Sequence, residues 1–292
     1  MDQSSPETVD FYKMQGCGND FVLIDNRGLG LDPAAMPEWA KKLCRRAFGV
    51  GADGLILLDA AQGRADVDYI WHFFNADGSR AAMCGNGARC AAKLAVALGL
   101  AGPRHRFGTD AGPIEAEVFP DTGLARVELT RPGPLEENVV LDLPGGSRSA
   151  SFVNTGVPHA VIFVDDASAV NVRELGAAVR FHARFAPAGT NANFVQAAGP
   201  GRLILRTYER GVEDETHACG TGACAAALAA RARGLGGDDY AVRTSGGETL
   251  RVSLQGDRVF LTGAADTVFT GAFSPGALGL SGLRAGLARE GA

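Results

Sequence analysis

The chain has 292 residues, 46% of them hydrophobic and 21% charged, and its net charge is −5 at pH 7. This length suggests about two domains and allows a sizeable core, so a peptide or disordered chain is excluded. The acidic excess is spread along the chain, and nucleic acid is not expected as a partner because phosphate binding needs clustered Lys and Arg.

Short apolar runs bounded by Gly, Asp, Asn and Pro predict strands in both halves of the chain. The predicted strands are residues 21–25, 54–58, 67–74, 114–119 and 124–129, then 160–164, 192–196, 203–208, 250–254 and 259–262. Helices are predicted at residues 37–46, 87–98, 172–180 and 222–233. The second and fourth helices are Ala-rich and stop before Gly99 and Gly234, which are typical of a helix C-terminus. Residues 132–147, rich in Pro and Gly, are the predicted linker.

The second half of the chain repeats the first. Residues 83–92 match residues 218–227 at an offset of about 135, and three further segments match in the same order at similar offsets. We therefore expect an α+β fold with two pseudo-symmetric domains, each a mostly antiparallel sheet wrapped around an Ala-rich central helix. The expected domains are residues 10–135 with Cys84 and 148–273 with Cys219, followed by a tail, 274–292, expected to be disordered.

Each repeat places a cysteine and a Gly-x-Gly sequence directly before its Ala-rich helix. Free N–H groups of a helix's first turn form an anion site, and the same positive helix end lowers the pKa of a neighbouring thiol. A single free cysteine is more commonly a small buried hydrophobe. Cys84 and Cys219 recur in duplicated settings, which favours a function, whereas Cys90 and Cys224 fall inside the helices and are expected in the core.

A pseudo-twofold would bring two such helix ends together across a cleft, with one thiol on each side. This arrangement suits inversion of a stereocentre without a cofactor, because one group must remove a proton from one face while another delivers a proton to the opposite face. A substrate carboxylate held by the helix N–H groups would be stabilised as negative charge spreads into it. The predicted substrate is therefore an amino acid, a small-molecule partner.

Five segments of the chain together resemble the diaminopimelate epimerase family. They are residues 16–21 (GCGNDF), 74–79 (FNADGS), 83–90 (MCGNGARC), 208–211 (YERG) and 218–225 (ACGTGACA). The similarity extends from about residue 11 to 273. It implies interconversion of LL- and meso-diaminopimelate, in lysine and peptidoglycan biosynthesis, without cofactor or metal.

The resemblance also implies roles for particular residues. Cys84 and Cys219 would be the acid–base pair, with His159 and Glu209 as supporting groups. The substrate would be bound by Asn19, Asn75, Gly85, Asn86, Asn191, Glu209, Arg210, Gly220 and Thr221. Two positions depart from the family pattern, since Val157 stands where many members carry Asn and Gly54 where some carry Gln. Each departure removes a potential hydrogen bond to substrate.

Plainer interpretations exist for the same residues. Asn19, Asn75 and Asn191 lie in Gly- and Asp-rich loops, where Asn commonly serves turn geometry. Arg210 could be a solvated surface charge, although a second substrate carboxylate needs a cation of this kind. His159 could be an ordinary core histidine.

Three alternative functions remain open. One is a related cofactor-independent isomerase of the same fold that acts on another amino or imino acid. Another is a thiol nucleophile enzyme, which would need one essential cysteine and not two. The third, a redox or metal-binding protein, is disfavoured because six cysteines include no C-x-x-C pair. The N-terminus has no signal-peptide pattern and no stretch reads as a membrane span, so a cytoplasmic protein without membrane partners is expected. A homodimer is compatible with the sequence.

Overall fold

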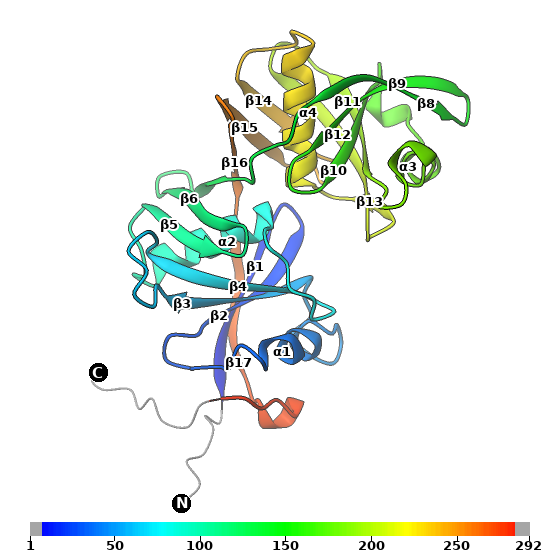
Figure 1. Ribbon diagram of the computed structural model, residues 1–292. Coiled ribbons are helices and arrows are strands. Elements are labelled where there is room, and N and C mark those ends of the chain that lie inside the picture. The colour runs from blue at the N-terminus through cyan, green and yellow to red at the C-terminus, as the bar shows by residue number, and fades with distance from the viewer. Residues whose placement is uncertain (1–7, 284–292) are drawn as a thin grey trace, which may run out of the picture. The chain divides into compact units, whose positions relative to one another are not determined.

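Two similar units of strands and helices make up residues 8–283, which the computed structural model describes (Figure 1). The first unit comprises the described residues through Ala125 together with those from Ala264 onward, and the second is Arg126–Gly263. The sequence halves therefore differ from the structural units at their ends. The last strand, which the sequence assigned to the second half, lies in the first unit.

The first unit carries two helices and most of its strands before Ala125. Its elements are β1 (Val9–Gly16), β2 (Asn19–Asp25), α1 (Met36–Leu43), β3 (Gly54–Ala60), β4 (Tyr69–Asn75), α2 (Gly85–Ala97), β5 (Arg104–Thr109), β6 (Gly112–Phe119) and β17 (Asp266–Phe273). Strands β7 (Leu124–Glu128) and β16 (Arg258–Ala264) run across the boundaries of the units.

The second unit holds the remaining elements. They are β8 (Glu136–Leu143), β9 (Gly146–Asn154), β10 (Pro158–Phe163), α3 (Val172–Arg180), β11 (Asn191–Ala197), β12 (Arg202–Glu209), β13 (Asp214–Thr216), α4 (Gly220–Ala232), β14 (Asp239–Arg243) and β15 (Thr249–Gln255). Short 3-10 turns occupy Ala167–Ala169 and Ala183–Phe185 here, and Gly276–Leu278 in the first unit.

The pairing of strands is the same in both units. A helix joins the parallel pairs β2–β3 and β10–β11, and antiparallel pairing continues to β4 and β12. The Ala-rich helices then connect the parallel pairs β4–β5 and β12–β14, which continue into the hairpins β5–β6 and β14–β15. The internal repeat of the sequence is thus a repeat of topology, and the expected α+β fold of two similar halves is confirmed.

Helices α2 and α4 are enclosed by strands of their own units. Helix α2 contacts β1, β2, β3 and β6, and α4 contacts β9, β10, β11, β12, β14 and β15. Ten residues of each thirteen-residue helix are buried. The small alanine side chains permit this close approach, because a bulkier residue would have to displace packed backbone. Gly99 and Gly234 follow these helices with φ of +66° and +69°, as predicted for helix C-termini.

The predicted linker is a β-hairpin of the second unit. Strands β8 and β9 pair antiparallel around a turn at Gly145, whose φ is +87°. Val139, Leu141 and Leu143 alternate with exposed residues and pack into the core of the second unit. The Pro and Gly residues that suggested a linker mark only the ends and turn of this hairpin. The alternation between them is that of a half-buried strand.

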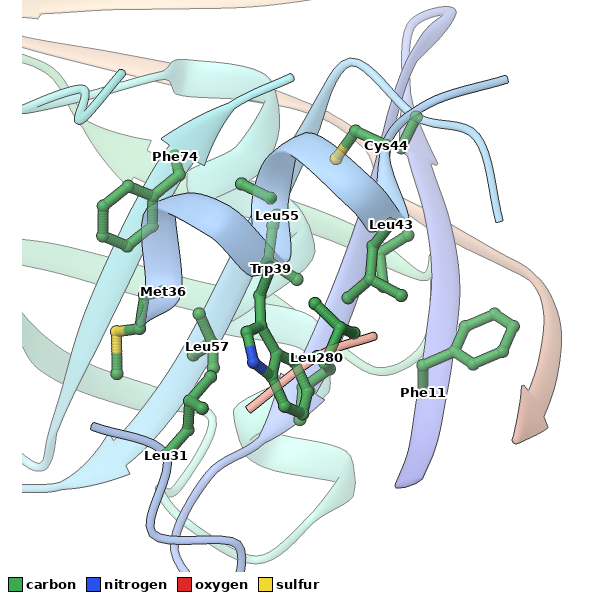
Figure 2. Packing of buried hydrophobic residues seen from close by; sticks show 14 of the residues in the cluster. Phe11, Leu31, Met36, Trp39, Leu43, Cys44, Leu55, Leu57, Phe74 and Leu280 are labelled. Carbon is green, nitrogen blue, oxygen red and sulfur yellow. The ribbon is translucent and has the colours of Figure 1, made fainter. Parts of the chain in front are cut away.

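Residues 274–283 differ from the disorder expected of the tail. They pack against α1 and its preceding loop, where Leu280 joins the cluster around Trp39 and Leu43 (Figure 2). The indole Nε1 of Trp39 donates a hydrogen bond to the carbonyl of Ser281 at 2.8 Å. The burial of Leu280 with Trp39 and Leu43 stabilises the packing of this segment against α1. The rest of that prediction, residues 284–292, lies outside the described residues.

Candidate functional site

Cys84 is the residue immediately before helix α2. Its extended backbone (φ −147°, ψ 118°) turns into the helix at Gly85, and its carbonyl accepts the first helical bond from Ala88 N at 2.8 Å. No side chain of the described residues caps this end of α2, and its first turn contains no acidic residue. The N–H groups of Gly85, Asn86 and Gly87 are thus available to an anion beside the half-buried thiol.

Asn19 lies next to this thiol. Its Oδ1 accepts from Cys84 Sγ at 3.7 Å and from Asn86 Nδ2 at 3.4 Å, while its own Nδ2 donates to Asp53 Oδ2 at 2.6 Å. Asp53 also accepts from the backbone N–H of Asp20 at 3.1 Å. The Asp53 carboxylate therefore determines the orientation of the amide, with its oxygen toward the cysteine.

Asn75 ends strand β4 and is exposed. Its Nδ2 donates to Ser79 Oγ at 2.9 Å, and its backbone N–H donates to Ser79 O at 2.9 Å. These bonds close the loop after β4, as expected of Asn in a turn. Cys84, Gly85, Asn86 and Asn19 thus lie together in the structure, whereas the hydrogen bonds of Asn75 are made within its own loop.

Cys219 has the equivalent place in the second unit. It precedes α4 with extended backbone (φ −120°, ψ 108°), and again no side chain within residues 8–283 caps the helix. Its buried Sγ lies 3.4 Å from the hydroxyl of Thr221. Gly220 and Thr221 supply the first N–H groups of the helix, so the predicted anion site is repeated here.

His159 is fully buried on β10, with no exposed surface. Asn193 Nδ2 donates both to Ala160 O at 3.0 Å and to His159 Nδ1 at 3.1 Å, and Asn193 Oδ1 accepts from Thr207 at 3.0 Å. His159 Nδ1 is therefore an acceptor, and the ring proton resides on Nε2. Among the described residues, Nε2 has no hydrogen-bond partner.

Asn193 also connects His159 to the Cys219 helix. A Cβ added at Gly222 would lie 2.5 Å from Asn193 Oδ1 and 3.3 Å from Cys219 Sγ. Only glycine leaves room for this contact, so His159, Asn193 and the first turn of α4 form one neighbourhood. Sequence reasoning missed Asn193. Its signal was the alternation of Asn191 and Asn193 in an apolar strand, which places both on one face.

Burial lowers the pKa of His159 to about 3. The imidazole of the unfolded chain binds a proton near pH 6.5, whereas that of the folded chain binds one only near pH 3. The free energy of unfolding therefore decreases as the pH falls from about 6.5 to about 3. We expect the free energy of unfolding to lose ~2 kcal/mol from this group between pH 8 and pH 5. His159→Gln should remove that part of the pH dependence in chemical denaturation. Replacement of the exposed His217 by Gln is the matched control, and equal pH slopes in all three proteins would contradict the prediction.

Asn191, Glu209 and Arg210 gather at the adjoining ends of β11 and β12. Asn191 Nδ2 donates to Pro158 O and its Oδ1 accepts from Arg210 N, both at 2.8 Å. Thr216 Oγ1 donates to Glu209 Oε2 at 2.8 Å. The half-buried Arg210 reaches Ala188 O at 3.3 Å, and it forms no ion pair with any carboxylate of residues 8–283. Its charge is therefore available to an anionic ligand.

Gly54, one of the two departures from the family pattern, has no space for a side chain. A Cβ there would lie 2.7 Å from Phe73 Cε2 and 2.8 Å from Phe74 O on the neighbouring strand β4. The glycine allows β3 and β4 to pack closely. A glutamine at this position would require β4 to move.

A groove of about 990 Å³ on the second unit contains none of the candidate cysteines. Its charged lining is largely paired internally, as Arg173 binds Asp214 at 2.6 Å and Arg206 binds Glu215 at 2.6 Å. Concavity alone therefore does not identify it as the site. Across the described part of the chain, no three His, Cys, Asp or Glu side chains are placed to hold a metal ion. No helix of residues 8–283 has the length and apolarity needed to span a membrane.

Solved structures with this fold include racemases and epimerases. A probable proline racemase from Agrobacterium radiobacter K84 has a TM-score of 0.65 at 19% identity, covering 90% of this chain and 92% of that one. A hydroxyproline epimerase from Agrobacterium vitis has a TM-score of 0.64 at 16% identity, with coverage of 92% and 93%. The chain thus has the two-unit α+β fold of these proteins.

Similarity in sequence identifies the family. The model of the diaminopimelate epimerase family matches residues 11–133 and 151–268. The diaminopimelate epimerase of Aquifex aeolicus is 45% identical over 275 residues, which cover 91% of this chain and 98% of that protein. The corresponding protein of Hydrogenobaculum sp. is 44% identical over 274 residues, with 90% and 97% covered. The chain belongs to the diaminopimelate epimerase family.

Proposed function

We propose that the protein is an isomerase that interconverts LL- and meso-diaminopimelate with Cys84 and Cys219 as its two acid–base groups. The observation that carries the proposal is the duplicated arrangement of a cysteine directly before an uncapped helix N-terminus. Membership in the diaminopimelate epimerase family supports the choice of substrate. The reaction belongs to lysine and peptidoglycan biosynthesis, and we expect it in the cytoplasm.

In the proposed reaction one proton leaves the α-carbon and another proton is added to it. A thiolate accepts the α-proton, and the electron pair of the broken C–H bond spreads into the adjacent carboxylate. The second thiol then delivers its proton to the opposite face, so the stereocentre is inverted and the two sulfurs exchange protonation states. First-turn N–H groups of the helices would bind the carboxylate and stabilise its growing charge.

The remaining candidate residues divide between the two ends of such a substrate. Asn19 and Asn86 adjoin Cys84, and Thr221 adjoins Cys219, so these are proposed to surround the reacting centre. His159 and Glu209 are proposed as supporting groups. Asn191, with Arg210 beside it, and Asn75 are proposed to hold the distal amino-acid group, whose carboxylate would pair with the Arg210 guanidinium.

The decisive experiment follows stereochemistry and isotope together. We expect the purified chain, incubated with LL-diaminopimelate in deuterated water without added cofactor, to form the meso isomer carrying deuterium at the inverted carbon. Chiral chromatography with mass spectrometry measures both properties. Activity that appears only with pyridoxal phosphate, or that a chelator abolishes, would contradict the proposal.

The same assay distinguishes the alternative substrates. An isomerase of this fold for another amino or imino acid would exchange the α-hydrogen of a substrate such as lysine or proline with solvent and leave diaminopimelate unlabelled. A single-nucleophile enzyme would show a covalent adduct on one cysteine and no solvent exchange at the α-carbon.

A further inference from the structure

Arg89 is a cation that the fold buries completely near the positive end of a helix. It lies in the second turn of α2, five residues after Cys84, and has no exposed surface. A cation near a helix N-terminus is disfavoured by the helix dipole, and a buried charge costs several kcal/mol unless it is paired. A position that carries both costs calls for a compensating role.

No carboxylate neutralises this charge within residues 8–283. The guanidinium instead donates to Asn86 Oδ1 at 3.0 Å, to the carbonyls of Gly85 and Ala264 at 3.2 Å, and to Cys17 Sγ at 3.3 Å. Gly16 leaves space for it, because a Cβ there would lie 3.2 Å from Arg89 Nη2. Cys17 adopts a left-handed conformation (φ +55°), which is uncommon for a residue with a Cβ, in the turn beside it.

These contacts act on the surroundings of Cys84. The bond to Asn86 Oδ1 turns the Asn86 amide so that its Nδ2 faces Asn19 Oδ1, the same oxygen that accepts from Cys84 Sγ. The bond to Gly85 O holds the first residue of the helix. The guanidinium therefore determines the position of two candidate substrate-binding groups, and it adds a positive charge to the second turn of the helix that Cys84 precedes.

The second unit lacks this cation. In the repeat alignment Arg89 corresponds to Cys224, which is buried in the alanine-rich α4. The two cysteines thus differ in their electrostatic surroundings although their backbones are equivalent. Arg89 is the one charged residue in the first two turns of α2, and the equivalent turns of α4 contain none.

We propose that Arg89 is a positioning residue for the Cys84 half of the reaction: its buried guanidinium orients Asn86 and the first turn of α2 and favours the thiolate of Cys84 over that of Cys219. The expected effect of Arg89 on the rate of epimerisation rests on the proposed function, whereas its expected effect on the ionisation of the Cys84 thiol does not.

Thiol titration tests the proposal without any substrate. Iodoacetamide modification across a pH series, followed by peptide mapping, gives separate midpoints for Cys84 and Cys219 in one sample. We expect a lower midpoint for Cys84 in the unsubstituted protein. In Arg89→Gln the Cys84 midpoint should rise by about 1 pH unit, so that its modification at pH 7 slows about tenfold. The Cys219 midpoint should stay the same.

Two further variants separate charge from geometry. Arg89→Lys keeps the cation but loses the planar fork, so we expect a nearly unchanged Cys84 midpoint together with about a tenfold lower kcat. Lys93→Gln removes another positive charge from α2, one turn farther along, where Lys93 is paired with Asp266. This control should leave both midpoints and kcat unchanged.

Three results would overturn the proposal. They are a Cys84 midpoint at or above that of Cys219 in the unsubstituted protein, a shift in Lys93→Gln as large as in Arg89→Gln, and a shift of Cys17 in place of Cys84. The first needs no variant to fold. If diaminopimelate is not turned over while the Cys84 midpoint behaves as expected, the proposed function fails and the electrostatic role of Arg89 stands.

Discussion

Replacing either Cys84 or Cys219 by alanine should lower the rate of epimerisation by at least about 10²- to 10⁴-fold, the usual contribution of a general acid–base group. In the proposed mechanism each thiol serves one face of the α-carbon, so neither can replace the other. Both cysteines precede their helices, where alanine needs no change of backbone, and we expect both variants to fold. The measurement is the initial rate of meso-diaminopimelate formation by each purified variant.

The controls for this experiment lie in the same helices. Cys90→Ala and Cys224→Ala remove buried sulfurs from α2 and α4 and should leave the rate close to that of the unsubstituted protein. Because each single variant keeps one thiol, slow exchange of the α-hydrogen can persist in one stereoisomer without inversion. A variant at Cys84 or Cys219 that retains full epimerisation would show that the reaction does not use two bases, and the single-nucleophile mechanism would then be favoured.

Replacing Arg210 by alanine should weaken binding of diaminopimelate by about 2–5 kcal/mol, as expected for loss of a desolvated charge pair. Asn191 holds the backbone of Arg210, and the side chain pairs with no carboxylate of the described residues, so the substrate's distal carboxylate would be its partner. The dissociation constant of an inhibitor or the KM of diaminopimelate gives the magnitude.

The matched control is Arg184→Ala in the same unit. Arg184 is paired with Glu136 on the surface, and its loss should change KM little. Lysine, which lacks the second carboxylate, supplies the complementary test. If the unsubstituted protein turns over lysine and diaminopimelate comparably, or if Arg210→Ala binds both as well as before, Arg210 does not select the substrate.

Local sequence predicted the elements around the two cysteines well. Strand β3, helix α3 and the Ala-rich helices α2 and α4 lie where apolar runs and C-terminal glycines indicated, with ends shifted by two residues or fewer. The apolar run and the terminal glycine that mark each element lie within a short stretch of the chain, and the internal repeat shows the same pattern a second time. The site motifs shared this advantage, because a cysteine and the helix that follows it are adjacent in the chain.

Elements that depend on distant partners were missed. Strand β1 pairs with β17 from the other end of the chain, with Val9 opposite Phe273, and neither strand was predicted. The hairpin β8–β9 was taken for a linker because its glycines and prolines outweighed a short alternation. For β1 and β17 the stabilising contact comes from outside the local window, so local composition carried little information. The two strands of the hairpin pair with each other, and there the local signal was present but was outweighed.

The sequence alone determined the duplication, the fold class, and the pairing of each cysteine with a helix N-terminus, because these are properties of contiguous residues. Only the tertiary structure decided which polar side chains meet. His159 joins Asn193 because β10 and β11 pair in parallel register, with His159 opposite Asn191. Arg89 is enclosed because the residue after β1, the helix α2 and the last residue of β16 converge on it, and a charge buried in this way cannot be recognised from its neighbours in the chain.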